Sequence, residues 1–334
     1  MDLETLWFVL IAAIWSAYLV LDGFDFGVGI LLAFLPRDEG DRRTMLATIG
    51  PVWDGNEVWL VIVGAAMFAA FPQWYATVFS GFYLALLLLL VLLIVRAVAF
   101  EWRERGEHPH WLGFWRWTTT VASVGVPFVW GVALANLLRG VPLASDGHYA
   151  GSFWDLFSPF TVAVGVGLVA LVTLHGALYL ALRTNGPLAE RASAAARRLA
   201  VPVAVAGAAL LAWTVAVAVD SNDKDVFPPV LPAALGVAAL LLAVALALAR
   251  RTGWAFLATA GAVIAFVATI FTSLYPRVLV SRPDFGNSLT IEGAASTHYM
   301  LSVLTVVAAV LVPTFALYQA WAYHLVIRRS REAA

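Results

Sequence analysis

The chain lacks cysteine and has few charged residues, and both features restrict the kinds of protein it can be. None of its 334 residues is cysteine, which excludes disulfides, thiolate zinc sites and iron–sulfur clusters. Charged residues make up only 12% of the chain, whereas they form about a quarter of a typical soluble domain. The formal net charge is −1, so no basic surface for nucleic acid is expected.

Apolar residues are abundant instead. They form 62% of the chain, and the mean hydropathy is +0.87. Spanning a bilayer core of about 30 Å takes roughly 20 apolar residues in a helix. The sequence therefore predicts an all-α membrane protein with nine transmembrane helices. The expected ranges are 5–34, 50–71, 76–100, 117–139, 159–182, 199–219, 229–250, 254–275 and 298–326.

No linker or soluble segment interrupts these ranges, so residues 1–334 are expected to form a single polytopic membrane domain. We expect two four-helix bundles and one peripheral helix. Fourteen tryptophans, several of them beside apolar runs, are typical of an aromatic belt at the membrane surfaces.

The basic residues predict the orientation. With the N-terminus outside, sixteen of the 20 basic residues fall in inner segments. Only four fall in outer segments: Arg139, Lys224, Arg277 and Arg282. Lys and Arg concentrate in cytoplasmic loops, so the chain is expected to run N-out and C-in with an odd number of helices.

Four carboxylates lie where the first two expected helices approach the inner surface. Asp22 and Asp25 are three residues apart near the end of the first helix, and Asp54 and Glu57 have the same spacing at the start of the second. Residues three apart share a helix face. A charge inside a membrane costs roughly 2.5–3.5 kcal/mol on insertion scales, so these positions indicate function. They are the candidate proton-uptake path, which Glu101 would extend.

A structural role for the same residues is an open alternative. Pro51 suits the first turn of a helix, which would place Asp54 near the positive end of the helix dipole. Asp22 or Asp25 could simply pair with an inner arginine such as Arg96, which could otherwise extend to the surface and set orientation.

The six histidines do not form a pattern that would hold a heme. A bis-histidine site needs imidazoles at similar depth on facing helices. Only His175 is expected deep in the membrane, and His298 lies near the outer end of the last helix. The sequence also contains no HExxH motif, phosphate-binding glycine loop or nucleophilic triad. We therefore expect no metal site and no redox cofactor ligands in this chain, and His175 to be a hydrogen-bonded core group.

Three motifs stand out in the first quarter of the chain. They are Asp22-Gly-Phe-Asp-Phe-Gly-Val-Gly29, Trp53-Asp54-Gly55-Asn56-Glu57-Val-Trp59 and Phe79-Ser-Gly-Phe-Tyr83. Together they resemble the N-terminal signatures of subunit II of cytochrome bd-type quinol oxidases, the cytochrome d ubiquinol oxidase subunit II family. The similarity continues through Gly131-Val-Ala133, Asn136-Leu-Leu138, Gly140-Val-Pro142, Asn287-Ser-Leu-Thr290, Val312-Pro313 and Trp321.

This resemblance implies a heme-free, nine-helix subunit in a bacterial cell membrane. It implies a partner, subunit I, which carries two b-type hemes and one d-type heme. The complex would oxidise quinol, reduce dioxygen to water in aerobic respiration and take protons from the cytoplasm. A structural quinone in subunit II and small single-helix accessory subunits are further ligands and partners that the family allows.

The resemblance also assigns residues. The aspartate associated with the proton route maps to Asp54 within Trp53-Asp54-Gly55-Asn56, and the Asp of the preceding Gly-Phe-Asp motif maps to Asp25. Trp53, Gly55, Asn56 and Arg96 are expected to support these carboxylates. Two other functions stay open: a secondary transporter with an acidic ion-coupling site in the first two helices, and a purely structural subunit.

Overall fold

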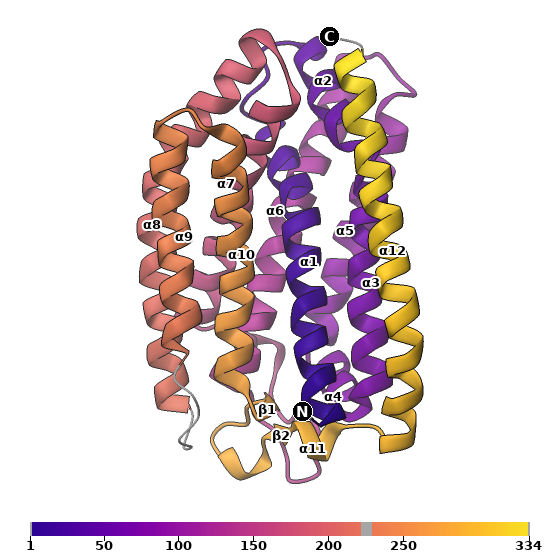
Figure 1. Cartoon of the computed structure of the whole chain (residues 1–334), viewed down its shortest axis with the longest axis vertical. Helices are drawn as coiled ribbons and strands as arrows, with labels where there is room; N and C mark the ends of the chain where they lie inside the picture. Colours follow the sequence, from indigo (N-terminus) through magenta and orange to yellow (C-terminus); the bar gives the residue numbers. More distant parts are fainter. Residues whose placement is uncertain (1, 222–228, 333–334) are drawn as a thin grey trace.

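The computed structural model describes residues 2–221 and 229–332, and most of them lie in long helices that run side by side (Figure 1). By length and composition, eight helices in these ranges could cross a membrane, or nine if a bent pair counts as one span. The single helices are α1 (Leu3–Leu31), α5 (Tyr83–Arg103), α6 (Pro109–Arg139), α7 (Pro159–Arg183), α8 (Gly186–Ser221), α9 (Val230–Leu248), α10 (Thr252–Leu274) and α12 (His298–Glu332). The mostly helical membrane class is confirmed.

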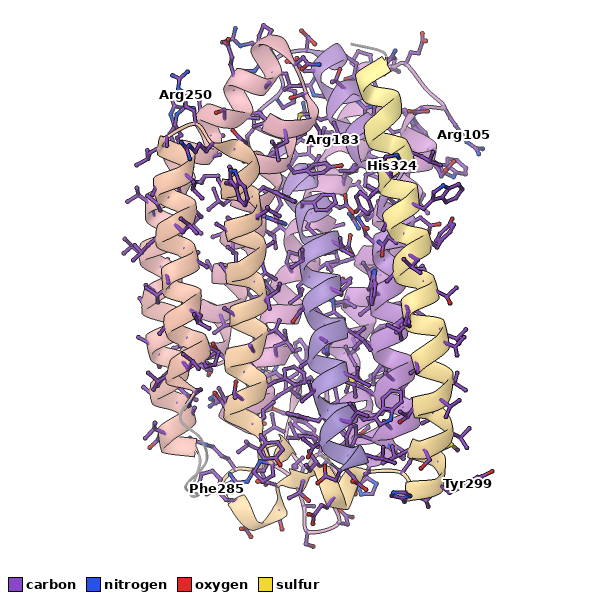
Figure 2. All side chains as sticks on the ribbon, viewed as in Figure 1. Arg105, Arg183, Arg250, Phe285, Tyr299 and His324 are labelled. Atoms are coloured by element: carbon purple, nitrogen blue, oxygen red, sulfur yellow. The ribbon has the colours of Figure 1, made fainter. Side chains whose placement is uncertain are left out.

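The two chain termini lie at opposite ends of the bundle (Figure 1). We call these the N-terminal end and the C-terminal end. Arg105, Arg183 and Arg250 gather toward the C-terminal end, whereas Phe285 and Tyr299 lie at the N-terminal end (Figure 2).

Polar residues at the helix starts satisfy backbone N–H groups that have no partner within the helix. The Asp2 carboxylate accepts a hydrogen bond of 2.9 Å from the backbone N–H of Thr5 at the start of α1. At the start of α7, Thr161 N–H donates to Ser158 Oγ and Ser158 N–H donates to Thr161 Oγ1. At a helix end, Gly140 follows the last residue of α6, and its φ of 92° suits a residue without a Cβ.

The second expected span, 50–71, is one arm of the bent pair. It corresponds to α3 (Trp53–Ala70), which follows the polar helix α2 (Glu39–Ile49) after a bend of 46°. Pro51 lies at the bend and not in the first turn of α3. Ion pairs tie α2 across the C-terminal end, from Arg103 of α5 to Glu39 and from Arg191 of α8 to Asp41.

The third expected span, 76–100, was wrong at its start. The chain forms two helices here, α4 (Pro72–Gly81) and α5, which are separated at Phe82. Tyr149 packs so closely on Gly81 that an added Cβ would lie 2.6 Å from its ring. Hydropathy cannot detect this contact, because the apolar run continues through the break. The apolar windows also underestimated α6 and α8, which begin at Pro109 and Gly186.

Short elements close the N-terminal end. Strand β1 (Arg277–Leu279) pairs antiparallel with β2 (Leu289–Thr290). The helices η2 (Phe285–Asn287) and α11 (Ile291–Ala294) lie in the same connection, between α10 and α12, whereas η1 (Phe153–Leu156) lies between α6 and α7.

Helix α1 contacts α3, α6, α7, α10 and α12. Its closest approach is to α7, where Gly27 and Gly176 meet backbone to backbone. Helices α7, α8, α9 and α10 pack against one another, and α12 packs against α1 and α3. The polar residues of α1 are therefore enclosed by other helices.

Candidate functional site

A cluster of polar side chains lies inside the bundle, where α1, α3 and α5 meet. Asp22 and Asp25 of α1, Asn56 of α3 and Arg96 of α5 are all fully buried. Buried charges need partners, because removing them from water without compensation is very costly. The contacts of these four residues therefore decide what the cluster can do.

Asp22 and Arg96 form a buried ion pair. Arg96 Nη1 lies 3.2 Å from Asp22 Oδ1 and 4.0 Å from Glu57 Oε2. The guanidinium also stacks over the ring of Phe26 at 4.4 Å. Arg96 therefore does not extend to the surface, as one alternative allowed. It is a fixed positive charge shared unequally by two carboxylates from different helices.

Asp25 has a different environment. Asn56 Nδ2 donates a hydrogen bond of 2.7 Å to Asp25 Oδ2 and one of 3.2 Å to the Leu21 carbonyl. The closest polar contact recorded for Asp25 is thus an amide and not a cation. The two aspartates of one motif therefore have separate partners, although they lie on one face of α1.

Helix α12 completes the cluster with residues that the sequence did not single out. Gln319 Nε2 and the Tyr323 hydroxyl donate to Asn56 Oδ1 at 2.8 and 2.7 Å. The indole N–H of Trp59 donates to Gln319 Oε1 at 2.5 Å. Gln319 and Tyr323 are four residues apart and so share a face of α12. This four-residue spacing is the sequence feature that could have identified Gln319 and Tyr323 as part of the cluster.

The remaining candidates lie progressively further out. The Glu57 side chain is 22% exposed, and its charge interacts with those of Asp22, Arg96 and Asp54. Asp54 and Glu101 are exposed on the surface of this chain. The structure thus brings together Asp22, Asp25, Asn56 and Arg96, with Glu57 at the edge. It does not bring Asp54 and Glu101 into the buried part.

The other motif residues support α3. The ring of Trp53 packs against that of Phe100 with centroids 5.2 Å apart, which links the start of α3 to α5. The Gly55 carbonyl lies 3.4 Å from Gln319 Nε2. These contacts hold the N-terminal turn of α3 between α5 and α12.

His175 is buried away from the carboxylates and is fully hydrogen-bonded. Its Nδ1 lies 2.6 Å from Thr259 Oγ1, and its Nε2 lies 3.2 Å from the Val20 carbonyl. Because a carbonyl only accepts, Nε2 carries a proton. Its ring stacks on Phe256 at 4.2 Å. Within the described ranges, no group of three or more His, Asp or Glu side chains could hold a metal ion.

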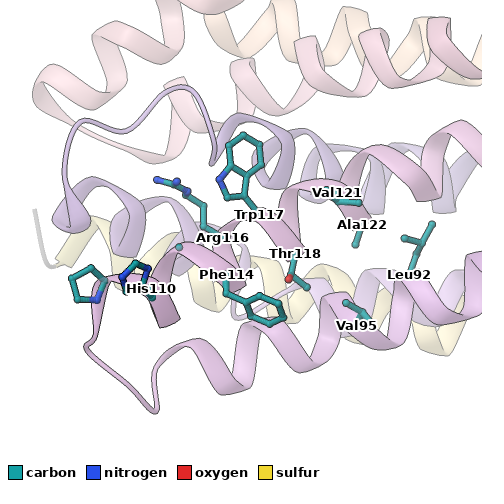
Figure 3. Close-up of a pocket in the computed structure, with 11 residues that line it drawn as sticks. Leu92, Val95, His110, Phe114, Arg116, Trp117, Thr118, Val121 and Ala122 are labelled. Carbon is teal, nitrogen blue, oxygen red and sulfur yellow. The ribbon is translucent and has the colours of Figure 1, made fainter.

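The hollow between α5 and α6 lies apart from this cluster. It has a volume of about 650 Å³, and Figure 3 shows His110 and Arg116 toward one end and Leu92 at the other. None of its lining residues is a carboxylate.

Comparison of the sequence with known proteins finds one family over nearly the whole chain. The family model for cytochrome bd terminal oxidase subunit II matches residues 3–326. Cytochrome bd ubiquinol oxidase subunit 2 of Bacillus subtilis is 37% identical, with coverage of 98% of this chain and 97% of that protein. Cytochrome bd-I ubiquinol oxidase subunit 2 of Escherichia coli K12 is 36% identical, with coverage of 96% and 93%.

The fold has a solved counterpart. A chain of the bd oxidase from Geobacillus thermodenitrificans superposes with a TM-score of 0.78 and covers 98% of both chains at 21% sequence identity. At that identity the match speaks for the fold alone.

Proposed function

The chain belongs to the cytochrome bd terminal oxidase subunit II family, and from this premise we propose what its polar cluster does. The protein is the second subunit of a quinol oxidase in a bacterial membrane. This complex is an oxidoreductase that couples quinol oxidation to dioxygen reduction. The resemblance in the motifs is thereby confirmed. The secondary-transporter alternative is not favoured, because the relatives are oxidase subunits over nearly their whole length.

Within the complex, the chain scaffolds the heme-bearing subunit I and contributes a route for protons. The observation that carries this proposal is the gradient of burial along α1 and α3. Asp54 is on the surface, Glu57 is partly exposed, and Asp22 and Asp25 are enclosed. Carboxyl groups placed in this way can pass protons inward from water. Hemes b and d are in subunit I, so the route has to end at a surface shared with that subunit.

The carboxylates divide between two roles. Asp22 is held by Arg96, and this pair joins α1 to α5 in the manner of a structural contact. Asp54, Glu57 and Asp25 are the proton-exchanging groups, and Glu101 widens the acidic entrance. The structural alternative thus applies to Asp22 and Arg96, and the proton route uses the remaining three.

The orientation N-out and C-in belongs to the same proposal. It is supported by termini at opposite ends of the bundle and by Arg105, Arg183 and Arg250 at the C-terminal end (Figure 2). This orientation opens the route to the cytoplasm. Two four-helix bundles with α12 as the peripheral helix is the grouping supported by the contacts of α7 to α10 with one another.

A structural quinone is part of the proposal. A groove of about 420 Å³ between α3, α4, α5 and α6 is lined by apolar side chains, which suits an isoprenoid tail. Trp15 also lines it, and its buried indole N–H has no hydrogen-bond partner in the part of the chain that the structure describes. Such a donor suits a quinone oxygen. Lipid and small accessory subunits would cover the exposed apolar side chains of α12.

Purification under mild conditions is expected to recover this chain together with a heme-bearing membrane subunit. The optical spectrum of the intact complex should then contain heme d and heme b bands. Isolation of a single chain that transports a solute and has no associated heme spectrum would contradict the oxidase assignment.

Asp54→Asn in the assembled complex is expected to slow oxygen reduction roughly tenfold, which corresponds to about 1.4 kcal/mol in the barrier. The amide keeps the shape of the side chain but cannot take up a proton. Oxygen consumption and heme content would be measured on the same sample. Glu190→Gln, at an exposed carboxylate of α8, is the matched control and should leave turnover unchanged. Unchanged turnover in Asp54→Asn would remove Asp54 from the route, and loss of heme would assign it to the scaffold.

A further inference from the structure

The amide side chains near Asp25 form a series of hydrogen bonds whose donors and acceptors can be arranged in only one way. It begins at Trp59, whose indole N–H can only donate. Gln319 must therefore present Oε1 to Trp59, at 2.5 Å. Its amide nitrogen then faces Asn56 Oδ1 at 2.8 Å and the Gly55 carbonyl at 3.4 Å. Both of these atoms accept, so this orientation of Gln319 is satisfied on each side.

At the other end of this series, the orientation of the Asn56 amide is fixed by a separate contact. Asn56 Nδ2 lies 3.2 Å from the Leu21 carbonyl, which can only accept. The same nitrogen donates to Asp25 Oδ2 at 2.7 Å. Tyr323 adds a second donor to Asn56 Oδ1. The Asn56 amide therefore makes four hydrogen bonds, and each agrees with the direction set by Trp59.

Turning the Asn56 amide over would break this agreement at two of its four contacts, those with Gln319 and with the Leu21 carbonyl. Its NH₂ group would then face the NH₂ group of Gln319, and its oxygen would face the Leu21 carbonyl. Buried polar groups left without partners are costly, so the reversed arrangement is excluded as long as Gln319 keeps its direction.

The direction has a chemical consequence for Asp25. Because Oδ2 accepts from Asn56, a proton on Asp25 has to reside on Oδ1. Oδ1 is buried and has no hydrogen-bond partner among the residues of the described ranges. We infer that Gln319 of α12 is a positioning residue for Asp25, which it compels to bind and release its proton through Oδ1. The relevance of this to turnover rests on the proton route proposed above.

Infrared difference spectroscopy of the intact oxidase can test the inference. The carboxylic C=O band of Asp25 is identified by its loss in Asp25→Asn. In the unmodified protein this C=O is Oδ2, which is hydrogen-bonded to Asn56. The double variant Gln319→Met and Tyr323→Phe removes both donors to Asn56 Oδ1, so that only the contact of 3.2 Å with the Leu21 carbonyl still opposes a turn of the amide. Asp25 can then carry its proton on Oδ2 and donate it to Asn56, which leaves the C=O without a hydrogen bond. The band is expected to shift to higher frequency.

Thr305→Val is the matched control. It removes the bond of 3.0 Å from the Trp7 indole to Thr305, which ties α12 to α1 at a distance from the cluster. The Asp25 band should not move in this variant. If the double variant does not assemble, Trp59→Phe supplies the same test, because it releases Gln319 to turn. The expected result is then a band split toward higher frequency.

Three results would overturn the inference: an unshifted band in the variants, an equal shift in Thr305→Val, or no band of protonated Asp25 at any pH. Failure of the proton route has a different signature. Turnover would then be unchanged in Asp25→Asn, while the band shift in the Gln319 variants would still occur.

Discussion

Replacing Arg96 with methionine is expected to destabilise the subunit by about 3–5 kcal/mol, the typical cost of removing one member of a buried ion pair. Methionine fills much of the arginine volume, so the loss is chiefly electrostatic. Asp22 would remain in a site with no exposure to water, without its cation 3.2 Å away, and its carboxylate would have to take up a proton or stay uncompensated. Glu57, 4.0 Å from the same guanidinium, would lose its neighbour as well. Thermal unfolding of the purified complex, monitored by heme retention, measures the effect.

Two control variants separate charge from packing. Arg198→Met changes an exposed arginine of α8 and should alter stability by no more than about 0.5 kcal/mol. Combining Arg96→Met with Asp22→Asn removes both charges and should restore most of the loss, because a buried pair replaced as a unit is often nearly neutral. A single Arg96→Met variant as stable as the unmodified complex would show that the pair does not hold α1 to α5.

The second large effect is expected at Gly27. A Cβ there would lie 2.0 Å from the Val172 carbonyl and 2.8 Å from the Cα of Gly176. These are backbone atoms of α7, so no side-chain rotation can relieve the overlap and the two helices must move apart. Gly27→Ala is therefore expected to cost about 3 kcal/mol, at the upper end of the usual range for overpacking. The unfolding temperature of the assembled complex would report it.

The control for this prediction is another helical glycine. A Cβ on Gly113 of α6 meets no atom within 4 Å, so Gly113→Ala should be neutral or stabilising by up to about 1 kcal/mol from helix propensity. An equally harmless Gly27→Ala would contradict the prediction. It would mean that α1 and α7 are further apart at Gly27 than these distances indicate.

The sequence predicted the membrane class and the buried aspartates well, because both depend on local properties. Long apolar runs have to form helices in lipid, and the spacing of Asp22 and Asp25 places them on one face of α1. The apolar run is divided at Phe82, beside Gly81, and Tyr149, which packs on Gly81, is distant in the sequence. No periodicity could have predicted it.

The second motif shows a different limit. Asp54 and Glu57 do share a face, as their spacing predicted, but the face turned fully inward carries Asn56 and Trp59. Spacing indicates which residues lie together and does not indicate which way they point. The sequence left two alternatives open for Arg96, pairing with an aspartate or extending to the surface, because an arginine at the end of an apolar run usually reaches the surface.

The hydrogen bonds of Asn56 also constrain how the subunit is made. Its oxygen is bonded to Gln319 and Tyr323, which follow it by 263 and 267 residues. Synthesis proceeds from the N-terminus, so α1 and α3 emerge from the ribosome long before α12 does. Until the last helix inserts, the nascent chain carries an incomplete polar centre in the bilayer. A chain that terminates early never completes it, which gives cellular quality control a chemical difference between finished and unfinished subunits.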